Sequence, residues 1–151
     1  MLGGVNVTAP PHVREPALHV VDTVLSAPAA LLIARIALTC PFWIGGMMKL
    51  IAWDAALAEM THFGLMPAPL FAASVAALQL SASLAIIVDR FAWLAAGALG
   101  LFTLAASIMA HDFWNYVGQD RVMQANTFLE HLAIIAGLVL AAMISRADRP
   151  V

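Results

Sequence analysis

The sequence predicts an all-α fold, a membrane bundle of four helices with a short interfacial helix between the first and second spans. Hydrophobic residues make up 63% of the 151-residue chain and charged residues only 11%, whereas a soluble domain is about a quarter charged. Four apolar segments are long enough to cross about 30 Å of hydrocarbon at about 1.5 Å per residue. These segments are residues 29–51, 68–88, 91–110 and 125–144.

The predicted spans form one transmembrane domain, residues 29–144, between two tails. Residues 1–28 are a polar N-terminal tail that contains three closely spaced prolines, so we expect an extended segment there. Within it, residues 17–25 could form a short helix at the membrane surface. A cleaved signal peptide is not expected, because the apolar run contains Arg35 and is followed by no A-x-A pattern. Residues 145–151 form the C-terminal tail.

The connections between the spans are short. Only Asp89 and Arg90 separate the second span from the third, which predicts a tight antiparallel hairpin. The loop after the first span reads WDAALAEMTHFG, with Asp54 as a candidate N-cap and Gly64 as a candidate helix stop. Its apolar residues recur at helical spacing, so we expect a short helix lying in the outer interface.

The distribution of Lys and Arg predicts the orientation of the spans. The side that carries both termini and the hairpin holds more of these residues than the opposite side. The first set comprises Arg14, Arg90, Arg146 and Arg149, and the second comprises Lys49 and Arg121. We therefore expect both termini in the cytoplasm and the spans in a bacterial inner membrane.

Arg35 is the most unusual residue of the first span, because a guanidinium in hydrocarbon needs a partner or a route to water. It lies about 9 Å along the helix from the predicted start. Ser83 falls at a similar depth in the second span, with Gln79 further along. Three interpretations stay open: a hydrogen bond within the bundle to Ser83, Gln79 or a backbone carbonyl, snorkelling to the inner head groups, and contact with an anion or a quinone.

Polar residues also gather at the opposite end of the bundle. Lys49 ends the first span, and Glu130 and His131 begin the fourth, so a Lys49–Glu130 pair is expected. Thr103 and Ser107 precede His111 at intervals of four residues and share one face of the third span. Such a polar stripe normally faces the bundle interior and could line a shallow cavity that opens outward.

Four interpretations of this polar end stay open. Its histidines and carboxylates are His62, His111, His131, Glu59, Asp112 and Glu130. Their spacing matches no known ligand motif, so no metal site is assigned. A bis-histidine haem has no support beyond two imidazoles. Imidazole and ammonium groups suit a quinone or a small anion, and a polar network that only pins the helix ends is the fourth interpretation.

Several function classes are disfavoured by composition. The net charge of −2 and the lack of a basic tract argue against nucleic acid as a partner. Cys40 is the single cysteine, so it can form neither an internal disulfide nor a CxxC pair. No arrangement of a nucleophile with a base stands out. Ala96 and Gly100 form a small-xxx-small pair, which permits close packing against a neighbouring helix or a second protein.

These motifs resemble the DoxX family of small four-helix membrane proteins. The resemblance rests on Arg35 with FWIGGMMKL in the first span, GLMPAPL before the second, AHDFW after the third and FLEHLAIIAGLVL in the fourth. It covers residues 29–143. It implies a membrane-embedded, redox-associated protein, since relatives include a subunit linked to thiosulfate:quinone oxidation and partners of secreted redox enzymes.

Two departures from the family pattern bear on function. Gln79 stands where family members commonly carry a glutamate followed by a glycine pair, and a glutamine cannot ionise. Glu130 and His131 stand where the family often has lysine and asparagine, which reverses the local charge. The departures weaken the case for catalysis and favour an accessory role.

We therefore expect a non-catalytic accessory subunit of a redox-linked or other membrane complex that contributes to a quinone-facing surface. The alternatives are a quinone- or thiosulfate-linked oxidoreductase and a small transporter. No catalytic residue is assigned, and no cofactor is evident apart from a candidate quinone. The expected partners are membrane lipid and either another protein or a second copy of the chain. The candidate substrate-binding residues are Arg35, Lys49, Gln79, Ser83, His111, Glu130 and His131.

Overall fold

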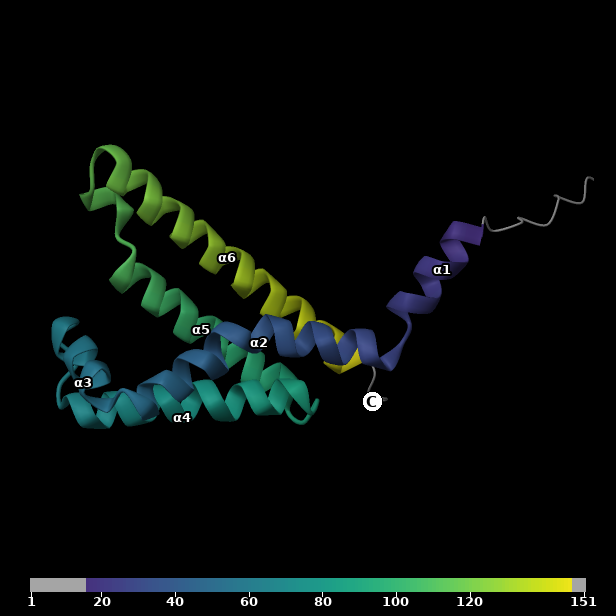
Figure 1. Ribbon diagram of the computed structural model, residues 1–151, viewed down its shortest axis with the longest axis horizontal. Helices are drawn as coiled ribbons and strands as arrows, with labels where there is room; N and C mark the ends of the chain where they lie inside the picture. The colour runs from purple at the N-terminus through teal and green to yellow at the C-terminus, as the bar shows by residue number, and fades with distance from the viewer. Residues whose placement is uncertain (1–15, 148–151) are drawn as a thin grey trace, which may run out of the picture. The chain divides into compact units, whose positions relative to one another are not determined.

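The computed structural model describes residues 16–147, and every regular element among them is a helix (Figure 1). The elements are α1 (Pro16–Leu25), α2 (Pro28–Ile51), α3 (Trp53–His62), α4 (Ala68–Ile87), α5 (Ala92–Ala110), the 3-10 helix η1 (Phe113–Asn115) and α6 (Gly118–Ala147). The chain forms two compact units, residues 1–31 and 32–151. Apart from the first four residues of α2, the features discussed after α1 belong to the second unit.

The first unit contains α1, which matches the short helix predicted over residues 17–25. Proline at its first position suits a helix start, because the missing N–H is not needed there. Its place at a membrane surface stays a prediction. The extended segment predicted before it and the last residues of the C-terminal tail, with Arg14 and Arg149, lie outside the described residues.

Four helices are long and apolar enough to cross a membrane, which confirms the predicted fold class. They are α2, α4, α5 and α6. The last of them begins at Gly118, seven residues before the predicted segment 125–144. At about 1.5 Å per residue its 30 residues span about 45 Å, more than the hydrocarbon thickness of about 30 Å. The polar first turns of α6 therefore extend beyond the apolar layer.

The short helix predicted between the first two spans is α3. Its start differs from the prediction, because Ala52 is the N-cap residue and no side chain caps the helix, while Asp54 lies in the first turn. An acidic residue there still interacts favourably with the helix dipole. Its end is as predicted: Gly64 has a φ of +70°, and the Leu65 N–H donates to the Met60 carbonyl at 2.8 Å, which completes a Schellman motif.

The tight hairpin between α4 and α5 is also present, and it contains two left-handed residues without being a glycine turn. Asp89 and Phe91 have φ values of +56° and +57°. The Arg90 N–H donates to the Ala85 carbonyl at 2.9 Å, so Asp89 takes the place that glycine usually holds at a helix end. Aspartate tolerates this conformation better than most residues do.

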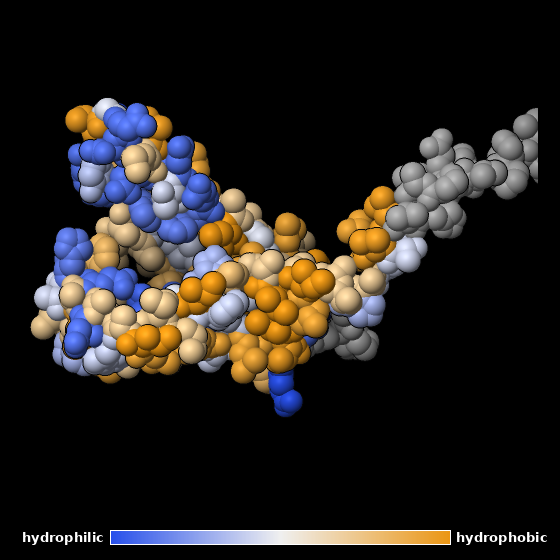
Figure 2. Space-filling view, viewed as in Figure 1, coloured by the Kyte–Doolittle hydropathy of each residue, from blue (hydrophilic) through white to orange (hydrophobic). Residues whose placement is uncertain are grey.

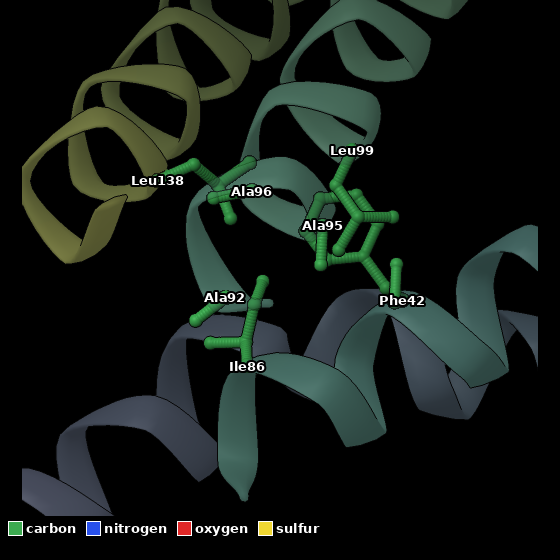
Figure 3. Packing of buried hydrophobic residues seen from close by; sticks show 8 residues of the cluster. Phe42, Ile86, Ala92, Ala95, Ala96, Leu99 and Leu138 are labelled. Carbon is green, nitrogen blue, oxygen red and sulfur yellow. The ribbon is translucent and has the colours of Figure 1, made fainter. Parts of the chain in front are cut away.

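A core of small, branched and aromatic side chains holds α2, α4, α5 and α6 together (Figure 3). Its buried members are Phe42, Ala82, Ile86, Ala92, Ala95, Ala96, Leu99 and Leu138. The alanines let neighbouring backbones approach closely. Ala96 of the predicted small-residue pair is thus used inside the bundle, whereas a Cβ at Gly100 would meet no atom within 4 Å.

The outer surface of the spans is apolar, as a lipid-facing surface must be. Large exposed hydrophobic residues occur on every span, among them Ile33, Leu84, Leu101 and Val139. Figure 2 shows hydrophilic residues gathered over α3 and over the beginning of α6, with apolar residues over the middle of the bundle. The polar end predicted from the sequence therefore comprises α3, the end of α5 and the start of α6.

Candidate functional site

Arg35 is buried, and its Nη2 lies 3.0 Å from Oδ1 of Asp89 in the α4–α5 turn. The prediction that Arg35 bonds to Ser83 or Gln79, which was made from matched depths, was wrong. A buried guanidinium needs a full negative charge rather than a neutral oxygen to offset its desolvation. Within residues 16–147, Ser83 Oγ is buried without a hydrogen-bond partner. Arg35 therefore connects α2 to the hairpin and does not reach outward past the bundle.

Lys49 at the opposite end is also paired, but not with Glu130 as predicted. Its Nζ lies 2.9 Å from Oε2 of Glu59 on α3, whereas Glu130 is exposed on α6. The reason is visible in Figure 1, where the beginning of α6 diverges from α3 and from the end of α2. The short helix α3 therefore brings the nearer carboxylate to Lys49.

Two histidines from α5 and α6 meet at this polar end. The ring centroids of His111 and His131 are 5.0 Å apart with an interplanar angle of 48°. His111 Nδ1 lies 2.7 Å from Oε1 of Gln124, and His131 Nδ1 lies 2.9 Å from Oγ of Ser107. The stripe predicted along α5 is therefore present, with Thr103 and Ser107 buried between the helices.

The hydrogen bonds determine which ring nitrogens donate. The Ser107 hydroxyl donates to the Thr103 carbonyl at 2.7 Å, so its oxygen accepts from His131 Nδ1. The neutral His131 ring then keeps an acceptor lone pair at Nε2. In the same way, Oε1 of Gln124 accepts from His111 Nδ1.

A cavity of about 140 Å³ lies between α2, α4, α5 and α6. We call it the Gln79 cavity. Its polar lining comes from Gln79, Thr103 and His131. Its apolar lining comes from Pro41, Phe42, Phe102, Ala106 and Ile134. The cavity therefore brings together one polar residue from each of α4, α5 and α6 with one phenylalanine from each of α2 and α5.

Gln79 is the most informative residue of this cavity. It is only 7% exposed, and among residues 16–147 its Oε1 has no hydrogen-bond partner. A buried oxygen left without a donor costs about 1–3 kcal/mol. Gln79 is therefore a cavity residue whose carboxamide oxygen is a buried acceptor without a donor.

The glycine pair of α2 makes room for Gln79. A Cβ at Gly45 would lie 3.5 Å from Gln79 Nε2, and a Cβ at Gly46 would lie 2.9 Å from Leu80 Cγ. Any larger residue at Gly46 would force the Leu80 side chain or the α2–α4 spacing to shift, because real Cβ atoms do not approach other heavy atoms that closely. The motif FWIGGMMKL thus shapes the cavity wall.

The structure divides the predicted site residues into three places. Gln79 and His131 line the cavity, and His111 lies beside it. Arg35 and Ser83 lie toward the turn, and Lys49 and Glu130 are not among the cavity residues. Among residues 16–147, no three histidine, cysteine, aspartate or glutamate side chains come close enough to bind a metal ion.

Three interaction partners were not predicted from the sequence. Asp89 and Glu59 are the ionic partners, and Gln124 accepts from His111. The signal for Asp89 was its place in the turn at the Arg35 end. Glu59 offered a weaker signal, as one of the two acidic residues of the helix that follows Lys49. Nothing in the sequence distinguished Gln124 from the other polar residues of early α6.

Comparison with known proteins agrees with the predicted family. The DoxX family model matches residues 30–112, from the beginning of α2 to the end of α5. A relative is the inner membrane protein YphA of Escherichia coli (strain K12), which is 28% identical over 127 residues, 83% of this chain and 90% of that protein. No solved structure matches. Because the family model matches more than half of the residues of this chain, the chain belongs to the DoxX family.

Proposed function

We propose that this protein is an integral inner-membrane subunit of a redox-linked complex, and that its Gln79 cavity binds the head group of a quinol-class molecule. The family and the name of the E. coli relative support the location in an inner membrane. The excess of Lys and Arg near the hairpin and the termini supports cytoplasmic termini. The unpaired Oε1 of Gln79 is the observation that carries the ligand part of the proposal.

The polar groups of the cavity all offer acceptors. The Thr103 hydroxyl donates to the Leu99 carbonyl at 2.7 Å, so its oxygen has lone pairs to offer. Gln79 Oε1 lacks a donor, and the neutral His131 ring has its acceptor at Nε2. A hydroquinone donates two hydroxyls, whereas a quinone only accepts. The Gln79 amide also offers N–H donors, but acceptors come from all three polar residues, so we expect the cavity to bind the reduced form more tightly.

The apolar lining and the absence of a cation from the lining favour the same ligand. Phe42 and Phe102 offer aromatic surface to a flat ring. The cations that were candidates for anion binding are engaged elsewhere, Arg35 with Asp89 and Lys49 with Glu59. A neutral aromatic head group is thus a better match than an anion.

The subunit role is supported because the candidate catalytic residues do not lie together in one pocket. An oxidoreductase acting alone was expected to bring Arg35, Lys49, His111 and Glu130 to one pocket, and none of these four lines the Gln79 cavity. The single thiol of Cys40 cannot cycle as an internal dithiol. In our proposal the electron acceptor belongs to a partner polypeptide.

Binding can be tested with the full-length protein in lipid nanodiscs and a tailless methoxylated benzoquinol held under anaerobic conditions. We expect the quinol to bind more tightly than the oxidised quinone, and Gln79→Leu to weaken quinol binding by about ten-fold or more, because one buried hydrogen bond is lost. Ser81→Ala is the matched control, since Ser81 is an exposed serine of the same helix. Equal binding of both forms, or no effect of Gln79→Leu, would contradict the proposal.

The subunit part has its own test. After mild solubilisation of native membranes, we expect the chain to co-purify with a polypeptide that carries a redox cofactor. A chain that always elutes alone would refute this part while leaving the ligand proposal open to the binding measurement.

A further inference from the structure

We infer that the Gln79 cavity is the inner half of a two-part site, and that an apolar groove beside it receives the hydrocarbon tail of the same molecule. This inference rests on the proposed function and extends it from a head group to an amphipathic ligand. The ligand class is a hydroxylated aromatic ring that carries an alkyl or isoprenoid chain.

The groove lies between α3, α4 and α5 and has a volume of about 220 Å³. We call it the α3 groove. Its lining is nearly all carbon, with contributions from Met60 of α3, Phe63 directly after that helix, Phe71 and Val75 of α4 and Met109 of α5. One ionisable residue, Glu59, also lines it, and that carboxylate is paired with Lys49. A polar ligand would find no set of hydrogen-bonding groups in this groove. A hydrocarbon chain would find apolar contacts along it.

The two spaces share a wall. Phe102 and Ala106 line both the Gln79 cavity and the α3 groove. They are four residues apart on α5 and therefore occupy the same helix face. Each of two neighbouring residues of α5 lines one of the two spaces: Thr103 lines only the cavity, and Ala105 lines only the groove. In our inference, a molecule whose ring lies in the cavity extends its substituent past Phe102 and Ala106 to the adjacent groove.

The wall on the α3 side is held in place by the fold. Ala56 and Met60 of α3 pack in a buried cluster with Ala68 and Ala72 of α4. The Lys49–Glu59 ion pair joins the same short helix to the end of α2. The groove is therefore built before any ligand arrives, which limits the ordering cost of binding.

Head and tail reinforce each other because they are linked. In a bilayer, a free acyl chain can fill the groove with little gain, since lipid is as apolar as the groove. A chain attached to a ring that is already bound has a high effective concentration at the groove. The two-part site therefore selects a tailed quinol over both a tailless quinol and a hydrocarbon chain.

The inference can be tested with three probes in nanodiscs: a tailless benzoquinol, the same quinol with a decyl tail, and a decyl-substituted benzene without hydroxyls. We expect the tailed quinol to bind about ten-fold more tightly than the tailless one. Ala105→Phe should fill the groove, remove that advantage and leave the tailless quinol unaffected, because Ala105 does not line the cavity. Leu101→Phe is the matched control, since Leu101 is exposed on α5 and lines neither space.

The outcomes separate the inference from the proposed function. Equal binding of tailed and tailless quinols, with no effect of Ala105→Phe, would overturn the two-part site and leave the head-group proposal standing. Failure of both quinols to bind would refute the head-group proposal itself. Binding of the decyl benzene as tight as that of the tailed quinol would show a groove for any acyl chain and would also overturn the inference.

A second measurement does not depend on how well the Ala105→Phe variant folds. A diazirine at the end of the decyl tail should label peptides that contain Phe63 or Phe71 in the wild-type protein, because these residues line the groove. Labelling confined to the exposed face around Leu101 would contradict the inference.

Discussion

The two ends of the bundle handle buried polarity in different ways. At the turn end, Arg35 is paired with Asp89 at 3.0 Å, and Arg146 lies over the Trp93 ring at 5.3 Å from its centroid. At the histidine end, neutral groups form a hydrogen-bonded chain in which His131 contacts Ser107 and faces a cavity. The turn end thus buries a charged pair inside the bundle, whereas the histidine end has its ion pair, Lys49–Glu59, at the partly exposed α3 and neutral acceptors around a cavity.

The difference follows from the cost of burial. An unpaired charge in an apolar interior is too costly to keep, so Arg35 lies against a carboxylate as its ionic partner. An unpaired carboxamide oxygen costs only about 1–3 kcal/mol, which a fold can tolerate. Gln79 can therefore remain available for a ligand, whereas Arg35 cannot.

The largest effect should come from Arg35→Ala. The substitution leaves the Asp89 carboxylate partly buried without its cation, so we expect a loss of about 3 kcal/mol in the free energy of unfolding in detergent. Arg90→Ala is the control, because Arg90 is exposed in the same turn, and it should change stability by less than about 0.5 kcal/mol. Equal losses for the two variants would show that the Arg35 pair does not hold the turn end together.

Gly46→Ala should come next and tests the packing beside the cavity. The new Cβ would lie 2.9 Å from Leu80 Cγ and 3.3 Å from Gln79 Cβ, so we expect destabilisation of about 2 kcal/mol from overpacking. Gly100→Ala is the matched variant, because nothing lies within 4 Å of its added carbon. That helical position should become more stable by up to about 1 kcal/mol. Thermal unfolding of both variants in the same detergent would compare them, and a stable Gly46→Ala protein would argue against close α2–α4 contact.

Two substitutions of Asp89 should separate charge from backbone conformation. Both Asp89→Ala and Asp89→Gly remove the partner of Arg35, but glycine adopts the φ of +56° without strain. We therefore expect the glycine variant to be more stable than the alanine variant by about 1 kcal/mol. Chemical unfolding of the two proteins side by side measures this difference. If alanine were equally stable, the left-handed turn would not be retained in the variants.

The smallest effect is expected for Lys49→Ala at the histidine end. The Glu59 side chain is 43% exposed, so its ion pair should contribute less than about 1 kcal/mol to stability. The same unfolding assay would detect a larger contribution, and a loss comparable with that of Arg35→Ala would remove the contrast between the two ends. Binding of a tailed quinol should be more sensitive than stability, because α3 forms one wall of the groove.

Much of the architecture could be predicted from local patterns. The spans, the Gly64 helix stop and the hairpin at Asp89 follow from apolar length and turn chemistry, which depend on neighbouring residues alone. Partners could not be predicted as well. Depth matching along straight spans directed Arg35 to Ser83, because it ignored a turn residue whose carboxylate reaches into the bundle.

The candidate site shows the same limit more clearly. Gln79, His111 and His131 were singled out from the sequence, but neither the cavity that joins Gln79 to His131 nor the role of Gln124 could be seen there. The direction in which α6 diverges from α3 decided which of these residues meet. Leu138 of α6 packs in the buried core with residues of α2, α4 and α5, which are far from it in the sequence.

The sequence by itself determined that this chain belongs in lipid, that it has four helices of spanning length, and that Arg35 needs a partner. These properties depend on transfer free energies and hydrogen-bonding needs that each segment carries with it. Only the tertiary structure decided that Asp89 is that partner, that Lys49 pairs with Glu59, and that Gln79 keeps an unpaired oxygen in a cavity. Which groups meet depends on the angles at which helices cross, and those angles arise from side-chain packing between segments far apart in the chain.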